Sequence, residues 1–302
     1  MPNWNDISQE IGNTSSPHDA VRKKYLFALS ELTGRNTIIY YSGWLQKQEL
    51  ANGERIHVSV NDNDKAGFMS AISNLDKSKG LDLILHTPGG DIAATESIVN
   101  YLKSIFGNDV RAIVPQLAMS AGTMIACSCS SIVMGNHSSI GPIDPQIAGI
   151  PAHGIIEEFD TAAQQISLDQ TRAILWQPII AKYSPTLIGQ CQKAIAWSTE
   201  MVKEWLRENM LQSETNPVAT AESIVSYLGS YAMTKSHARH ISATKAASLG
   251  LKIDKLEDDP DLQDAVLSVH HSTIHTLATT NAIKIIENQD GISYIQAHRG
   301  VR

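Results

Sequence analysis

The 302-residue chain has few cysteines and no excess of basic residues. Three cysteines are too few for a disulfide scaffold, and the spacing of Cys127, Cys129 and Cys191 does not match a zinc site. Its 24 Lys and Arg stand against 31 Asp and Glu, a net charge of −7. A nucleic-acid binder usually carries a basic face, so this balance predicts no nucleic-acid partner.

The chain also lacks signals for export or membrane insertion. Residues 1–25 contain no apolar stretch of signal-peptide length, so we expect a cytoplasmic protein. No Asp, Glu, Lys or Arg occurs from Ala112 to Ile143, a stretch long enough to cross a bilayer. Pro115, Asn136 and several glycines interrupt its apolar character, however. We therefore predict a buried strand–helix–strand and no integral membrane segment.

Strand-like runs and helical periodicities alternate through the first half of the chain. The strand-like runs are 37–45, 81–87, 110–116 and 130–135. Helical patterns cover 65–76 and 91–106, and a third helix starts near Ser120. This alternation predicts an α/β fold in which helices cover a mostly parallel sheet.

The flanking regions are mainly helical. Apolar spacing predicts a helix over 20–32, and residues 155–211 should form two or three helices because they contain Pro178 and Pro185. Short helices are expected at 218–229 and 241–249. The last segment, 283–297, has strand-like composition around Asp290-Gly291, which predicts a hairpin.

Two loops follow predicted parallel strands, at the edge where catalytic groups gather in α/β sheets: HTPGGD (86–91) and QLAMSAGTM (116–124). Acyl transfer needs a hydroxyl on an accessible turn and backbone N–H groups aimed at the developing oxyanion. Ser120 supplies the first, and Gly89, Gly90 and Ala121 supply the second. Each loop also has a purely structural interpretation. Ser120 is a favoured helix N-cap, and Pro-Gly-Gly is a favoured tight turn.

Several motifs together carry a resemblance to a known family. They are RNTIIYYSGWLQK (35–47), HTPGG (86–90), SAGTMI (120–125), SSIGPID (138–144) and ISATKAASLGLKID (241–254). With them the chain resembles the Clp/crotonase superfamily, within it the ClpP-class peptidases and signal peptide peptidase A, and most closely the serine dehydrogenase proteinase family. The matching positions run from about residue 35 to 260.

The resemblance implies a fold, a reaction and an assembly. The expected fold is a Clp/crotonase-like superhelix of ββα units, with a helical arm at 1–35, a catalytic domain at 36–260 and a helix-and-hairpin extension at 261–302. The expected activity is that of a serine endopeptidase that cleaves peptides or proteins through an acyl-enzyme. Ser120 would be the nucleophile and Ala121 with Gly89 or Gly90 the oxyanion hole. A homo-oligomer with sheltered sites is implied, and no metal or organic cofactor.

The general base departs from the ClpP pattern. ClpP-type enzymes carry a histidine where this chain reads Ile143-Asp144. Asp144 could orient a base or a neighbouring subunit, or it could simply cap a turn. Signal peptide peptidase A uses a Ser-Lys dyad instead, and residues 179–195 resemble the segment that holds its lysine.

We therefore expect Lys182 as the base, with Lys193, His137 and His237 as alternatives. A base lysine must be largely neutral near pH 7, so burial would have to lower its pKa by about 3.

Two other functions fit the same fold. One is a catalytically silent scaffold that binds peptides, and the other is an acyl-CoA hydratase or isomerase, which also needs two oxyanion donors. A serine in the nucleophile loop, and no carboxylate there, argue against the hydratase.

Overall fold

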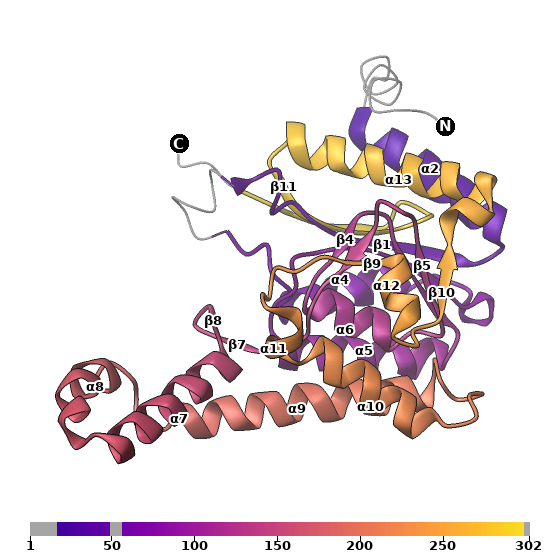
Figure 1. Ribbon diagram of the computed structural model, residues 1–302. Coiled ribbons are helices and arrows are strands. Elements are labelled where there is room, and N and C mark those ends of the chain that lie inside the picture. The colour runs from indigo at the N-terminus through magenta and orange to yellow at the C-terminus, as the bar shows by residue number, and fades with distance from the viewer. Residues whose placement is uncertain (1–16, 49–55, 299–302) are drawn as a thin grey trace.

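The structure, a computed structural model, describes residues 17–48 and 56–298. Its centre is a seven-stranded sheet in the order β10-β5-β3-β2-β1-β11-β12 (Figure 1). Neighbouring strands from β10 to β1 pair in parallel: β10 (Ile253–Lys255), β5 (Ile132–Met134), β3 (Val110–Val114), β2 (Leu81–His86) and β1 (Asn36–Ser42). The hairpin of β11 (Ala282–Asn288) and β12 (Ser293–Ala297) adds to β1 in antiparallel fashion.

Helices cover both faces of this sheet. One face carries α2 (Pro17–Thr33) and α13 (Pro260–Thr279), and the other carries α4 (Asn63–Ile72), α5 (Ile92–Phe106) and α6 (Ala121–Cys127) (Figure 1). The strands are apolar on both sides, as expected for parallel strands buried between helices. In β1, for example, Ile38 packs toward the second group and Ile39 toward the first.

A helical arm extends from the body of the molecule (Figure 1). It consists of α7 (Ala152–Leu168), the 3₁₀ turn Gln170–Arg172, α8 (Ala173–Ile180) and the first part of α9 (Leu187–Glu208). The arm has a small core of its own, in which Ile155, Leu187 and Cys191 pack together. The rest of α9, with α10 (Pro217–Leu228), packs under the body.

Short elements link these parts. A small sheet joins β4 (Leu117–Ala118), β6 (Ser139–Ile140) and β9 (Ile241–Ser242), and a two-stranded ribbon joins β7 (Gln146–Ile147) and β8 (Ile150–Pro151). The helices α11 (Tyr231–Thr234) and α12 (Ala243–Ser248) flank β9, and 3₁₀ turns lie at Lys77–Lys79 and Leu256–Asp258.

The predicted α/β fold with a mostly parallel sheet covered by helices is confirmed. The charge-free stretch forms β3, α6 and β5, as expected. No helix in the described part of the chain is both long and apolar enough to cross a membrane. The strand predicted over 37–45 ends at Ser42, and the tiny strands β4, β6 to β9 were not predicted individually.

The domain boundaries at 36 and 260 stay a prediction. The N-terminal helical segment predicted over 1–35, which is separate from the arm of α7–α9, falls partly outside the described residues. The predicted extension at 261–302 contains α13, and its hairpin contributes two strands to the central sheet.

Candidate active site

Ser120 stands at the turn between β4 and α6 in a conformation that L-residues rarely adopt. Its φ is 50° and its ψ is −114°. The residue precedes α6, but its side chain makes no capping hydrogen bond. Ser120 therefore stands at the N-cap position without using its side chain to cap α6. Backbone strain of this kind costs about 1–3 kcal/mol and is concentrated at functional sites.

The Pro88-Gly89-Gly90 turn lies against Ser120. A Cβ atom on Gly89 would lie 2.5 Å from the Ser120 Cβ, and the φ of Gly89 is +98°. A Cβ on Gly90 would lie 2.3 Å from the backbone N of Val60. Both glycines are needed because backbone and nucleophile approach them too closely for any side chain.

Two of the three predicted oxyanion donors have free N–H groups. Among the residues that the structure describes, neither Gly90 N–H nor Ala121 N–H donates a hydrogen bond. The Gly89 N–H, in contrast, donates to Thr87 Oγ1 at 3.2 Å. Ala121 is the first residue of α6, where N–H groups have no partner within the helix. The geometry thus favours Gly90 over Gly89 as the partner of Ala121.

A histidine and a buried aspartate meet beside this turn. His237 Nδ1 lies 2.8 Å from Asp144 Oδ1, and the Asp144 side chain is fully buried, whereas 27% of the His237 side chain is exposed. The second Asp144 oxygen accepts from Gln146 Nε2 at 3.1 Å. Asp144 thereby holds the ring of His237 and leaves its Nε2 without a bond to any described residue.

The small sheet explains why residues 93 positions apart meet. β6 and β9 are antiparallel, with Ile140 opposite Ile241. Continuing this register past Ile140 brings Asp144 level with His237. Gly141 N–H also donates to Thr123 Oγ1, which ties the segment before Asp144 to the nucleophile helix.

Ser120 and His237 line one cavity of about 380 Å³. The turn of Pro88, Gly89 and Gly90 forms part of its wall. Its apolar lining comes from α5, from α6, from the segment after β6, and from α9: Ile92, Ala93, Met124, Ile143, Pro145, Ile147, Ala194 and Trp197. The sequence analysis did not identify Trp197 or Ile147 as site residues, because α9 and the β7–β8 ribbon reach the cavity only through the tertiary fold.

The other predicted bases lie elsewhere. Lys182 is exposed between α8 and α9, at the arm, and does not line the cavity. Lys193 is exposed on α9 and is likewise absent from the lining, although the next residue, Ala194, contributes to it. His137 is exposed in the turn between β5 and β6. Of the four predicted bases, the structure brings only His237 to Ser120's cavity.

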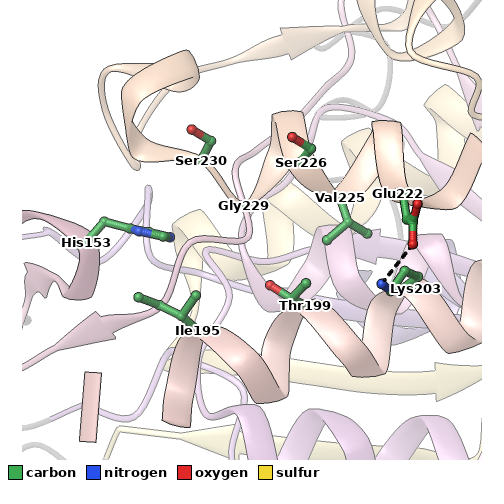
Figure 2. Close-up of a pocket in the computed structure, with 9 residues that line it drawn as sticks. All are labelled: His153, Ile195, Thr199, Lys203, Glu222, Val225, Ser226, Gly229 and Ser230. Carbon is green, nitrogen blue, oxygen red and sulfur yellow. Dashed lines mark hydrogen bonds and ion pairs between the residues drawn. The ribbon is translucent and has the colours of Figure 1, made fainter. Parts of the chain in front are cut away.

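A second cavity of about 210 Å³ lies between α9 and α10 (Figure 2). Lys203 on α9 pairs there with Glu222 on α10 at 3.4 Å, and His153 approaches from the start of α7 (Figure 2). None of the residues predicted for catalysis lines this cavity. It is therefore not the site of the predicted chemistry.

Other reactive groups do not compete with Ser120. Burial raises the pKa of Cys127 and of Cys129 to about 12, so neither thiol ionises near neutral pH. Within residues 17–48 and 56–298, no three His, Cys, Asp or Glu side chains are grouped as metal ligands. The expectation of no cofactor stays a prediction.

Comparison with known proteins gives one family and two relatives. A sequence model of the ClpP-like SDH-type serine proteinases matches residues 44–258. The uncharacterized protein MJ1495 of Methanocaldococcus jannaschii is 27% identical over 220 residues, 72% of this chain and 70% of its own. The uncharacterized protein MJ0137 of the same organism is 35% identical over 132 residues, and the match spans 44% of each chain.

Proposed function

The chain belongs to the family of ClpP-like SDH-type serine proteinases, and we propose that it is a serine endopeptidase with Ser120 as nucleophile and His237 as general base. The observation that carries the proposal is the shared cavity. A strained, uncapped serine, the glycine whose N–H is free (Gly90) and a histidine held by a buried carboxylate all border it, and the second free N–H belongs to the residue directly after the serine.

The proposed reaction proceeds through an acyl-enzyme. His237 Nε2 takes the proton of Ser120 Oγ, and Oγ attacks the carbonyl carbon of the scissile peptide bond. The N–H groups of Gly90 and Ala121 donate to the oxyanion. His237 then returns the proton to the leaving amine, which breaks the C–N bond, and water hydrolyses the ester by the same steps.

Asp144 has a defined part in this scheme. Its Oδ1 accepts the Nδ1–H of His237, which fixes the tautomer with a free Nε2 and stabilises the imidazolium that forms. No hydrogen bond joins His237 to Ser120 in the described structure, as is common before substrate binds.

His237 replaces Lys182 as the base that we propose. A Ser-Lys dyad needs a lysine that is buried next to the serine, because only desolvation makes its amine neutral near pH 7. Lys182 is exposed and lies outside the cavity within one copy of the chain. His237, in contrast, lines the same cavity as Ser120.

The expected substrate is a peptide or an extended segment of a protein. The cavity places apolar side chains of Met124, Ile143 and Trp197 near Ser120, together with exposed backbone of the glycine turn. Such a surface accepts a peptide side chain and leaves backbone groups for main-chain recognition.

We also propose that the chain forms a homo-oligomer through the arm. Leu168, Ile174 and Leu175 are exposed there by 88%, 75% and 68%, respectively. Large aliphatic side chains gathered on a projecting element mark interaction sites more often than single scattered ones do. A second copy of the chain is the partner that the resemblance implies.

Labelling with a fluorophosphonate tests the proposed chemistry. We expect the wild-type protein to be labelled on Ser120 and Ser120→Ala to take no label, while both keep the same far-UV circular dichroism. A silent scaffold or an acyl-CoA hydratase would take no label in either form. Hydrolysis of casein by the wild type then separates a peptidase from other serine hydrolases.

A further inference from the structure

A fully buried ion pair joins β11, the second strand from one edge of the sheet, to the start of α4. Lys284 Nζ, from β11, lies 2.8 Å from Oδ1 and 2.9 Å from Oδ2 of Asp64, and both side chains are fully buried. Tyr40 OH donates to Asp64 at 2.7 Å. Removing two charges from water is costly, so such a group persists only where its hydrogen bonds are satisfied. Stability alone gives no reason for a pair in this place.

The lysine has another acceptor, which lies outside regular structure. Lys284 Nζ donates to the carbonyl oxygen of Ser59 at 2.8 Å. The carboxylate of Asp64 accepts the Asn61 N–H at 2.9 Å. The ion pair therefore holds both ends of the short segment Ser59–Asn61, which belongs to no helix and forms only an isolated bridge at Val60.

Val60, at the centre of this segment, forms two backbone hydrogen bonds with the Pro88-Gly89-Gly90 turn and the residue after it. Its N–H donates to the carbonyl of Gly89 at 2.8 Å, and its carbonyl accepts from the Asp91 N–H at 3.0 Å. The two bonds flank Gly90, whose Cα has no room for a side chain against Val60. The position of Val60 thus sets the direction of the free Gly90 N–H.

We propose that Lys284, with Asp64 and Tyr40, is a positioning residue that fixes the oxyanion donor Gly90 through the Ser59–Val60 segment. The inference rests on the proposed function. Lys284 does not line the cavity, so it touches neither substrate nor Ser120. Its effect is transmitted by one hydrogen bond from Nζ to Ser59 and, through the next residue, by two hydrogen bonds between Val60 and the turn.

The same strand provides a matched control. Glu287, three residues along β11, points to the opposite face and pairs there with Arg22 of α2. Both of those side chains are buried, and neither contacts Ser59, Val60 or the glycine turn. Losing either cation leaves a buried carboxylate unpaired, so the two changes should destabilise the fold similarly. Only the loss of Lys284 should disturb the turn.

The test compares Lys284→Met with Arg22→Met, on the full chain and well below each melting temperature. Lys284→Met/Asp64→Asn serves as a second variant that leaves no unpaired charge and keeps acceptors for Tyr40 and Asn61. For the wild type and each variant, kcat and KM are measured on the fluorogenic peptide that the wild type cleaves best among a panel. A peptide aldehyde, whose hemiacetal oxygen occupies the oxyanion hole, is measured as an inhibitor.

Loss of an oxyanion donor costs about 10²–10³ in kcat, so a misdirected donor should cost about 10–100-fold. We expect that loss in both Lys284 variants, with KM changed less than about 3-fold and aldehyde affinity falling in parallel with kcat/KM. Arg22→Met should keep kcat near that of the wild type.

Equal kcat values for the folded Lys284 and Arg22 variants would overturn the inference and leave the proposed function intact. A wild-type protein whose Ser120 takes no fluorophosphonate would instead overturn the proposed function, and this inference with it.

Discussion

Ser120 holds a backbone conformation that favours glycine, and this strain can be measured. Ser120→Ala keeps the Cβ atom and hence the strain, whereas Ser120→Gly removes it. Strain of about 1–3 kcal/mol outweighs the roughly 0.5–1 kcal/mol that a glycine costs in chain entropy. We expect the free energy of unfolding of Ser120→Gly to exceed that of Ser120→Ala by about 1 kcal/mol, so that its urea midpoint is higher. Equal midpoints would mean that the turn is not strained.

The nucleophile and the glycine turn could be predicted from the sequence because their signals are local. Ser120, Gly89 and Gly90 each lie a few residues after an apolar strand, and parallel strands end at one edge. The base could not be chosen in this way. His237 reaches Asp144 only through the pairing of β6 with β9, two strands of two residues each, which are too short to leave a periodic signal.

At the scale of the element, β2 leads into the glycine turn of the candidate active site, and its last residue, His86, should make the fold sensitive to acid. His86 is fully buried, and its two ring nitrogens find no hydrogen-bond partner among the described residues. Its ring lies 4.4 Å from that of Trp44, measured between centroids. Burial lowers the pKa of His86 to about 3, and burial lowers the pKa of His270 well below its ordinary value.

Because these pKa values are lowered in the folded state, the unfolded chain binds protons more readily than the folded chain does. Above about pH 6.5 the imidazoles are neutral in both states and do not affect the free energy of unfolding. As the pH falls from there towards 3, the unfolded chain takes up protons that the folded chain does not, so the free energy of unfolding decreases. Each histidine contributes a slope of about 1.4 kcal/mol per pH unit.

We predict that His86→Phe reduces this acid sensitivity. Between pH 7 and pH 5, its free energy of unfolding should fall by about 2 kcal/mol less than that of the wild type. Urea unfolding at the two pH values measures the difference. His240→Phe, at an exposed position, is the control and should leave the slope unchanged. A slope in His86→Phe equal to that of the wild type would contradict the account.

At the same scale, the sequence predicted the helical character of residues 155–211. The segment 155–211 resolves into α7, α8 and α9, within the predicted two or three helices, but only Pro185 lies at a break, because Pro178 lies inside α8. What the pattern could not indicate is that α7 and α8 project while α9 runs on to line the cavity with Ala194 and Trp197. An apolar stripe has the same period whether it faces a core, a cavity or a partner.

At the scale of the whole molecule, the exposed arm predicts self-association. We expect the wild-type mass in solution to be a multiple of 32.9 kDa, and Ile174→Glu/Leu175→Glu to reduce it, because burying unpaired carboxylates in an interface is costly. Multi-angle light scattering after size exclusion gives the mass. Val218→Glu, at an exposed apolar position on α10, is the control. A wild type of 32.9 kDa would contradict this prediction.

The central claim, that His237 and not Lys182 activates Ser120 in a peptidase, is tested most directly by casein and fluorogenic-peptide hydrolysis. The assay compares the wild type, Ser120→Ala, His237→Ala and Lys182→Ala. We predict that Ser120→Ala and His237→Ala, although folded, lose kcat by about 10³-fold or more, and that Lys182→Ala stays within about 3-fold of the wild type. Full activity in His237→Ala together with an inactive Lys182→Ala would contradict the account and restore the Ser-Lys dyad.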